Sequence, residues 1–124
     1  MNPKTIHVEL NEGGTETFSA DKIFIDTGTR PAIPSIEGLN EAGYFTATTL
    51  MEHKEIPSHL LVIGGGYIGL EFGQMYRRFG SMITILEHSD RFLKKEDEDI
   101  ADEILKFLKA EEINVLINAE AISL

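Results

Sequence analysis

The chain has 124 residues, the size of one average domain, and its hydrophobic content of 42% is enough to form a core. Its formal net charge of −10 argues against nucleic acid or an anionic membrane surface as a partner, because both require a basic patch. The sequence has no cysteine, which excludes a disulfide, a thiolate metal site and a thiol nucleophile within these residues.

Two further classes of protein are disfavoured by pattern. No apolar stretch approaches the roughly 20 residues of a membrane-spanning helix, and the first residues lack the basic and apolar regions of a signal peptide, so we expect a cytoplasmic protein. The four histidines are scattered without metal-ligand spacing, and the acidic run 96–99 precedes a helical pattern whose positive end it suits. We therefore expect no metal site.

The first segment of the chain has the pattern of a β-hairpin. Ile6, Val8 and Leu10 alternate with polar residues, and a turn at residues 11–14 precedes a second run at Thr15–Phe18. A third apolar run, residues 22–26, leads into residues 27–31. After these, Pro34 and Gly38 indicate an irregular connecting segment. We predict a domain boundary there, with residues 1–35 in one unit and residues 36–124 in another.

The second segment alternates strands and helices. After a short helix at 48–52, we predict a strand at 60–63, a helix that ends at Gly80, a strand at 82–86, a helix at 98–110 and a strand at 114–118. This is a βαβαβ half of an α/β, Rossmann-like, doubly wound parallel sheet, preceded by an antiparallel hairpin. The further strands of such a sheet are missing. We expect a piece of a larger protein, and a homodimer is one way to cover the open edge.

The strand at 60–63 runs directly into a glycine-rich turn. Gly64, Gly66 and Gly69 satisfy the spacing G-x-G-x-x-G of a dinucleotide site, in which each glycine has a separate task. The first permits a tight turn, the second lets the backbone approach the phosphates, and the third lets the new helix pack closely on the strand. The helix N-terminus, which carries unpaired N–H groups, then faces the pyrophosphate.

Glu87 lies at the end of the next strand, close to the spacing of about 20 residues expected for the acid that binds the adenosine ribose. A carboxylate there accepts hydrogen bonds from the ribose hydroxyls of NAD and repels the 2′-phosphate of NADP, so we predict a preference for NADH. His88 and Arg91 are near enough in sequence to offset part of that repulsion. A glycine turn that binds no metabolite remains the alternative, and a methyltransferase is disfavoured by the third glycine.

Three phrases of the chain, residues 26–31, 64–71 and 85–91, together resemble the pyridine nucleotide-disulfide oxidoreductases, and most closely the group of lipoamide dehydrogenase, glutathione reductase and mercuric-reductase-like enzymes. The resemblance implies that residues 1–35 are the end of an FAD domain and that the rest is the first half of an inserted NAD(P) domain. The redox-active cysteine pair, the FAD glycine motif and the C-terminal dimerisation domain are absent. We therefore expect the isolated chain not to be catalytic.

The resemblance also suggests roles for single residues. It implies that Thr27 and Gly28 lie against the ADP half of FAD, that Tyr67 covers the flavin until nicotinamide displaces it, and that Glu71 pairs with a lysine near the nicotinamide end. A plain turn, a first-turn residue and a helix-surface glutamate are the respective alternatives. The complete set of candidate cofactor-binding residues is Gly64, Gly65, Gly66, Tyr67, Ile68, Gly69, Glu71, Glu87, His88, Thr27 and Gly28.

The sequence thus favours the NAD(H)-binding portion of an FAD-dependent oxidoreductase that passes hydride from NADH to flavin and then to a disulfide or similar acceptor. The partners it predicts are the dinucleotide and the missing FAD and dimerisation domains. A relative of the NADH oxidases is a second enzyme hypothesis. A stand-alone NAD(H)-sensing module, in which nucleotide binding biases a partner interaction, is a hypothesis of a different class.

Overall fold

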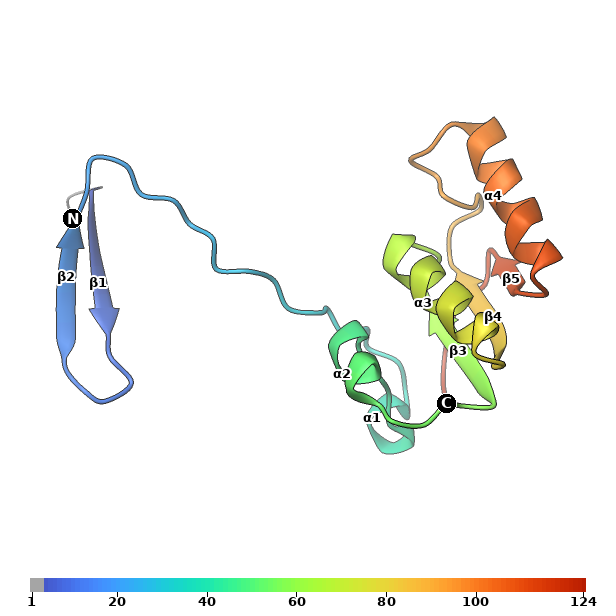
Figure 1. Cartoon of the computed structure of the whole chain (residues 1–124), viewed down its shortest axis with the longest axis horizontal. Coiled ribbons are helices and arrows are strands. Elements are labelled where there is room, and N and C mark those ends of the chain that lie inside the picture. The colour runs from blue at the N-terminus through green and yellow to red at the C-terminus, as the bar shows by residue number, and fades with distance from the viewer. Residues whose placement is uncertain (1–3) are drawn as a thin grey trace. The chain divides into compact units, whose positions relative to one another are not determined.

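The computed structural model describes residues 4–124 and divides into two compact units, Met1–Arg30 and Pro31–Leu124 (Figure 1). The first three residues of the predicted hairpin segment lie outside the described residues. Because the arrangement of the units is not determined, each is described by itself.

The first unit contains the predicted antiparallel hairpin. Strand β1 (Thr5–Glu9) pairs with β2 (Thr15–Ser19), with Ile6 opposite Phe18 and Val8 opposite Glu16. The third apolar run is different from what its composition suggests, since residues 23–30 form no regular structure. Phe24 is 87% exposed and Ile25 is 85% exposed. β-Branched and aromatic residues favour a strand only where a partner edge and a covering layer are available, and the hairpin supplies neither to this run.

The second unit contains a three-stranded parallel sheet in the order β3-β4-β5. Its strands are β3 (His59–Ile63), β4 (Met82–Glu87) and β5 (Asn114–Ile117), which are connected by α3 (Tyr67–Arg78) and α4 (Glu98–Ala110). Right-handed crossovers place both helices on the same face of the sheet. The α/β fold class and the βαβαβ order predicted from the sequence are confirmed, and the central strand β4 is hydrogen-bonded on both sides.

Two short helices precede the sheet. Helix α1 (Leu39–Ala42) has no counterpart in the sequence prediction, whereas α2 (Ala47–Glu52) matches the predicted short helix. The side chain of Thr46 accepts a hydrogen bond from the Thr49 N–H, and the Thr49 hydroxyl accepts one from the Thr46 N–H, which forms a capping box. Leu50 from α2 joins the core.

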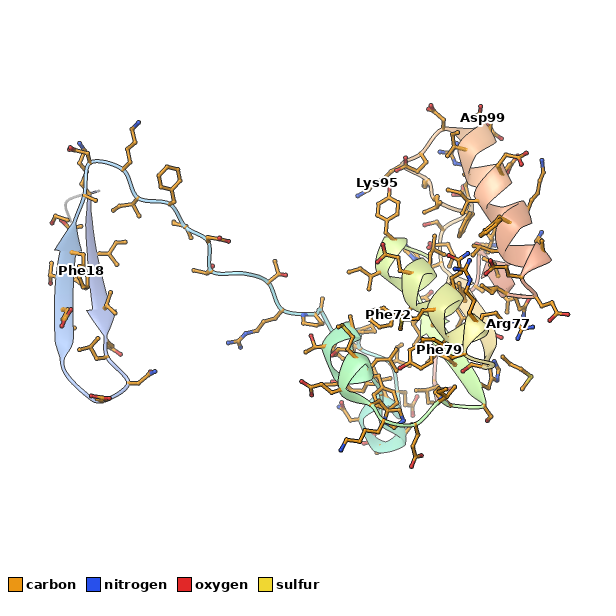
Figure 2. The ribbon with its side chains drawn as sticks, in the orientation of Figure 1. Phe18, Phe72, Arg77, Phe79, Lys95 and Asp99 are labelled. Carbon is orange, nitrogen blue, oxygen red and sulfur yellow. The ribbon has the colours of Figure 1, made fainter. Side chains whose placement is uncertain are left out.

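The core lies between the helices and the sheet. Ile83 and Ile85 of β4 are buried, together with Tyr76 of α3 and Leu108 of α4. Among the apolar residues that recur at helical spacing along α3, Tyr76 is buried and Phe72 packs against the core, whereas Ile68 is 62% and Phe79 is 56% exposed. Figure 2 marks Phe72 and Phe79 along this helix. The face that contacts the sheet also includes Gly73, where an added Cβ would lie 3.3 Å from the Ile85 Cδ1 atom. A residue without a side chain lets the helix backbone approach the sheet there.

Candidate functional site

The glycine-rich turn lies where β3 ends and α3 begins. Gly64 has φ +105°, in the region that favours glycine, and its N–H donates to the Leu86 carbonyl at 2.8 Å, which extends the pairing with β4. Gly66 is the N-cap of α3, and its carbonyl accepts the first helical hydrogen bond, from the Leu70 N–H at 3.0 Å. The N–H groups of residues 67–69 consequently have no carbonyl acceptor in the preceding turn of the helix.

The three glycines at positions 65, 66 and 69 differ in how much space a side chain would have. A Cβ at Gly69 would lie 2.5 Å from the Gly64 carbonyl oxygen and 3.0 Å from Val62 Cγ1, so this position is closed by the packing of helix on strand. A Cβ at Gly65 would lie 3.0 Å from a carboxylate oxygen of Glu87. At Gly66, apart from its two neighbours in the chain, no atom lies within 4 Å of such a Cβ. Gly66 therefore borders open space.

Glu87 ends β4 directly beside this turn, and it is only 9% exposed. Its Oε2 atom accepts a hydrogen bond from the Gly65 N–H at 3.0 Å, and its Oε1 atom accepts one from the Ser89 N–H at 2.8 Å. The Ser89 side chain and the His88 ring also contact this carboxylate. The arrangement fixes the carboxylate at the edge of the glycine turn.

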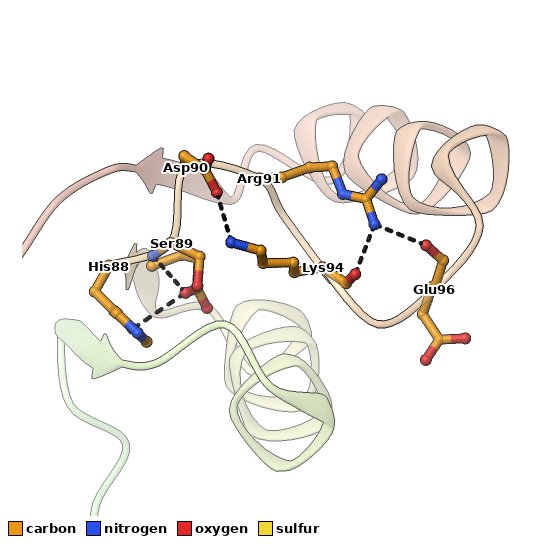
Figure 3. Close-up of polar contacts among 7 residues, drawn as sticks. His88, Ser89, Asp90, Arg91, Lys94 and Glu96 are labelled. Atoms are coloured by element: carbon orange, nitrogen blue, oxygen red, sulfur yellow. Dashed lines mark hydrogen bonds and ion pairs between the residues drawn. The ribbon is translucent and has the colours of Figure 1, made fainter.

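The ionisation of Glu87 reflects the same contacts. Burial raises the pKa of this carboxyl, but the hydrogen bonds from Ser89 and Gly65, together with the nearby His88 ring, outweigh burial and lower the pKa below its ordinary value. The Nδ1 atom of His88 lies 3.3 Å from Glu87 Oε1, and the His88 side chain is largely exposed. Figure 3 shows His88 and Ser89 at the start of the loop that follows β4. Glu87 is therefore held as an anion near neutral pH.

Arg91 lies in the same loop, but one of its guanidinium nitrogens is already engaged. It donates to the Lys94 carbonyl at 2.6 Å and to the Glu96 carbonyl at 3.1 Å (Figure 3). The ammonium of Lys94 in turn lies 3.2 Å from Asp90 Oδ1. These cations brace the loop internally. Arg91 was expected to offset part of the repulsion of a 2′-phosphate. One of its guanidinium nitrogens is instead bound to carbonyls of the same loop.

The remaining candidates on α3 are exposed. Tyr67, the first residue of the helix, is 61% exposed, and its hydroxyl donates to Glu96 in the loop before α4. This contact, followed by desolvation and the charge of Glu96, raises the pKa of Tyr67. Ile68 is exposed beside it. Glu71 lies one turn further along and lines, with Tyr67 and Phe107, a shallow groove of about 280 Å³ between α3 and α4.

Thr27 and Gly28 belong to the first unit and are both exposed in an irregular segment. Gly28 has φ +71°, and among residues 4–124, apart from its chain neighbours, none packs within 4 Å of its Cβ position. The proposed contacts of Thr27 and Gly28 with that cofactor stay a prediction.

The structure brings together the glycine turn, Glu87 and His88, and it adds two groups that sequence reasoning missed. These are the N–H groups of Gly65 and Ser89 as anchors of the Glu87 carboxylate. Main-chain donors leave no signal in residue types, so only the fold reveals them. Among residues 4–124, no cluster of three or more histidine and acidic side chains is placed to hold a metal ion. None of the described helices is long and apolar enough to span a membrane.

Comparison with known proteins gives consistent results. A model of the family "Pyridine nucleotide-disulphide oxidoreductase" matches residues 1–123. The chain is 42% identical over 120 residues to a probable pyridine nucleotide-disulfide oxidoreductase, RclA of Escherichia coli, which covers 96% of this chain and 27% of that protein. It is 45% identical over 102 residues to a mercuric reductase of Lysinibacillus sphaericus, covering 82% of this chain and 19% of the reductase.

Solved structures agree with the sequence comparison. The RclA flavoprotein disulfide reductase of E. coli superposes with a TM-score of 0.82 at 38% identity, over 94% of this chain and 27% of that chain. A water-forming NADH oxidase of Lactobacillus brevis, bound to NADH, has a TM-score of 0.73 at 29% identity, over 97% of this chain and 28% of that chain. The chain thus spans about a quarter of the length of these relatives.

Proposed function

Because this chain belongs to the pyridine nucleotide-disulphide oxidoreductase family, we propose that it is the NAD(H)-binding portion of an FAD-dependent oxidoreductase. In the whole protein, NADH supplies a hydride to the flavin, which passes electrons to a disulfide or similar acceptor. The residues of this chain bind and orient the dinucleotide. The FAD site and the dimerisation domain belong to the rest of the parent protein, so the isolated chain is not expected to catalyse turnover.

One observation carries the proposal: the Glu87 carboxylate is fixed by the N–H groups of Gly65 and Ser89 beside the open position at Gly66. The unpaired N–H groups at the start of α3 suit a pyrophosphate, and a carboxylate at the end of β4 suits the adenosine ribose. The spacing of acid and turn thus matches the two polar parts of one ADP moiety.

The same carboxylate supports a preference for NADH. A 2′-phosphate would bring further negative charge against a buried anion, and one guanidinium nitrogen of Arg91 is already bound to main-chain carbonyls. A tenfold preference requires only about 1.4 kcal/mol. The repulsion between Glu87 and a 2′-phosphate is of this order even with partial screening.

The likeness to a NADH-bound, water-forming NADH oxidase favours a second enzyme candidate, in which the same nucleotide-binding portion serves an oxidase. The two enzymes differ in the part of the parent protein that holds the final acceptor. A stand-alone NAD(H) sensor differs from both, because it requires tight NADH binding by this chain without flavin.

The test is an amide NMR titration of the 124-residue chain with NADH, NADPH and ADP-ribose. NADH and ADP-ribose should shift the signals of Gly64, Gly66, Gly69 and Ser89, and NADPH should do so only at higher concentration. Glu87→Gln removes the charge and should weaken NADH binding about tenfold, since a hydrogen bond to a charged group contributes roughly 1.5–3 kcal/mol. It should also reduce the discrimination against NADPH.

Glu41→Gln, an exposed change in α1, is the matched control and should leave both affinities unchanged. A well-folded spectrum that responds to none of the three nucleotides contradicts the proposed site. Equal responses to NADH and NADPH in the wild-type chain contradict the proposed preference but not the site.

A further inference from the structure

The contact between Tyr67 and Glu96 connects two segments that the sequence separates. Tyr67 is the first residue of α3, directly after the glycine turn, and Glu96 lies in the loop before α4. The loop holds Glu96 in place from both sides. Its carbonyl accepts from Arg91 at 3.1 Å (Figure 3), and its N–H donates to the Leu93 carbonyl at 2.8 Å. Tyr67 is therefore bound to a braced position.

In this arrangement the Tyr67 side chain lies along the groove between α3 and α4, which Leu70 and Phe107 also line. Apart from its two chain neighbours, no atom, the Tyr67 ring included, lies within 4 Å of the position of a Cβ on Gly64. The contact with Glu96 thus coincides with an accessible glycine turn.

Without the bond to Glu96, the Tyr67 side chain can adopt other rotamers. Side chains of a helix lean toward its N-terminus. For the first residue of α3, that direction leads back over the glycine turn. A ring there occupies the space that the phosphates of a dinucleotide need.

We propose that Glu96 is a positioning residue that holds Tyr67 clear of the glycine turn and so keeps the turn accessible to the dinucleotide. This inference rests on the proposed NADH site. The apparent affinity of a site falls in proportion to the fraction of molecules in the binding-competent arrangement. A released ring has about three staggered rotamers, so the Kd should rise roughly 1.5-fold if one of them covers the turn and roughly threefold if two of them do.

A purely electrostatic role for Glu96 predicts the opposite sign. Its carboxylate would repel the phosphates of NADH, so removing the charge would tighten binding. The direction of the change therefore separates the two explanations.

The test measures NADH affinity and Tyr67 ionisation in the 124-residue chain. Glu96→Ala and Tyr67→Phe should each raise the Kd for NADH roughly 1.5- to threefold, and the double variant should be no weaker than either, because both changes remove one contact. Tyr67→Ala combined with Glu96→Ala removes the ring itself and should restore wild-type affinity. Glu98→Ala, which removes an equal charge two residues away, is the control and should bind NADH as the wild type does.

Ionisation of Tyr67, followed by NMR of labelled tyrosine rings, reports the contact independently of NADH. Because Glu96 raises the pKa of Tyr67, Glu96→Ala should lower it, whereas Glu98→Ala should have little effect. Unchanged ionisation in Glu96→Ala overturns the contact. Unchanged or tighter NADH binding in that variant, or weak binding that persists when the ring is also removed, overturns the positioning role. A wild-type chain that fails to bind NADH contradicts the proposed function instead.

Discussion

Gly64, Gly66 and Gly69 follow one motif, but different physical limits exclude a side chain at each. Gly64 is limited by its backbone, with φ +105°, and Gly69 by space, since its Cβ would lie 2.5 Å from the Gly64 carbonyl oxygen. Gly66 is limited by neither, because its φ is −77° and it borders open space. Nothing in the folded chain requires glycine at this position. If glycine is required at Gly66, we propose that a ligand imposes the requirement.

This contrast predicts that two glycine-to-alanine changes have separate effects. Gly66→Ala should destabilise the chain by no more than about 1 kcal/mol, the cost of a weaker N-cap, but weaken NADH binding, because its methyl group would lie where we propose that phosphates approach. Gly69→Ala should destabilise the chain by about 1–3 kcal/mol, since helix and strand must move apart. Urea denaturation and NADH titration of both variants check this. Substantial destabilisation by Gly66→Ala, or unaltered NADH affinity, would contradict the assignment of this position to a ligand.

Glu87 predicts a dependence of stability on pH. Its pKa is lower in the folded chain than the value of about 4.3 expected for an unfolded glutamate. The unfolded state therefore binds more protons in acid, so the stabilisation from Glu87 is complete above that value and is lost as pH falls through the folded pKa. In urea denaturation between pH 6 and 3, Glu87→Gln should lose less stability on acidification than the wild type. Parallel curves for the two chains would contradict this contribution.

At the scale of elements, periodicity predicted the strands and the long helices because burial on one face leaves a regular pattern. The apolar repeat along α3 is borne out in part, since Tyr76 is buried and Phe72 packs against the core, but Ile68 and Phe79 are exposed. Residues 22–26 have the composition of a strand but no strand partner in their unit. Helix α1 has four residues, too few for a periodic signal.

The candidate site was also predictable only in part. The glycine turn and Glu87 were found because those side chains, or their absence, have a specific task in the motif. The donors from Gly65 and Ser89 and the Tyr67–Glu96 contact depend on how β3, β4 and the following loop are placed, which residue types do not record.

At the scale of the whole molecule, the two units differ in how much they bury. Every residue of β2 is exposed, whereas Ile85 in β4 is fully buried. An isolated two-stranded hairpin is at best marginally stable in water. The hairpin of this chain therefore depends on surroundings that residues 4–30 do not provide.

Hydrogen exchange should show this difference directly. We expect the amides of β1 and β2 to exchange within minutes and those of β4 to be the slowest, because exchange of buried central strands requires global opening. Deletion of residues 1–30 should leave the urea midpoint of the second unit unchanged. Protection of the hairpin comparable to that of β4, or a lower midpoint after the deletion, would contradict the independence of the two units.

The central position of β4 also constrains the order in which the chain acquires its structure. Both ladders of the parallel sheet use this strand, with Ile85 opposite Val62 on one side and Val115 on the other. Each pairing requires closure of a loop that contains a whole helix, and such closures are slower than local contacts. During synthesis, β3, α3 and β4 leave the ribosome before α4. Glu87 and the glycine turn, the two parts of the proposed dinucleotide site, therefore belong to the part of the sheet that can assemble first.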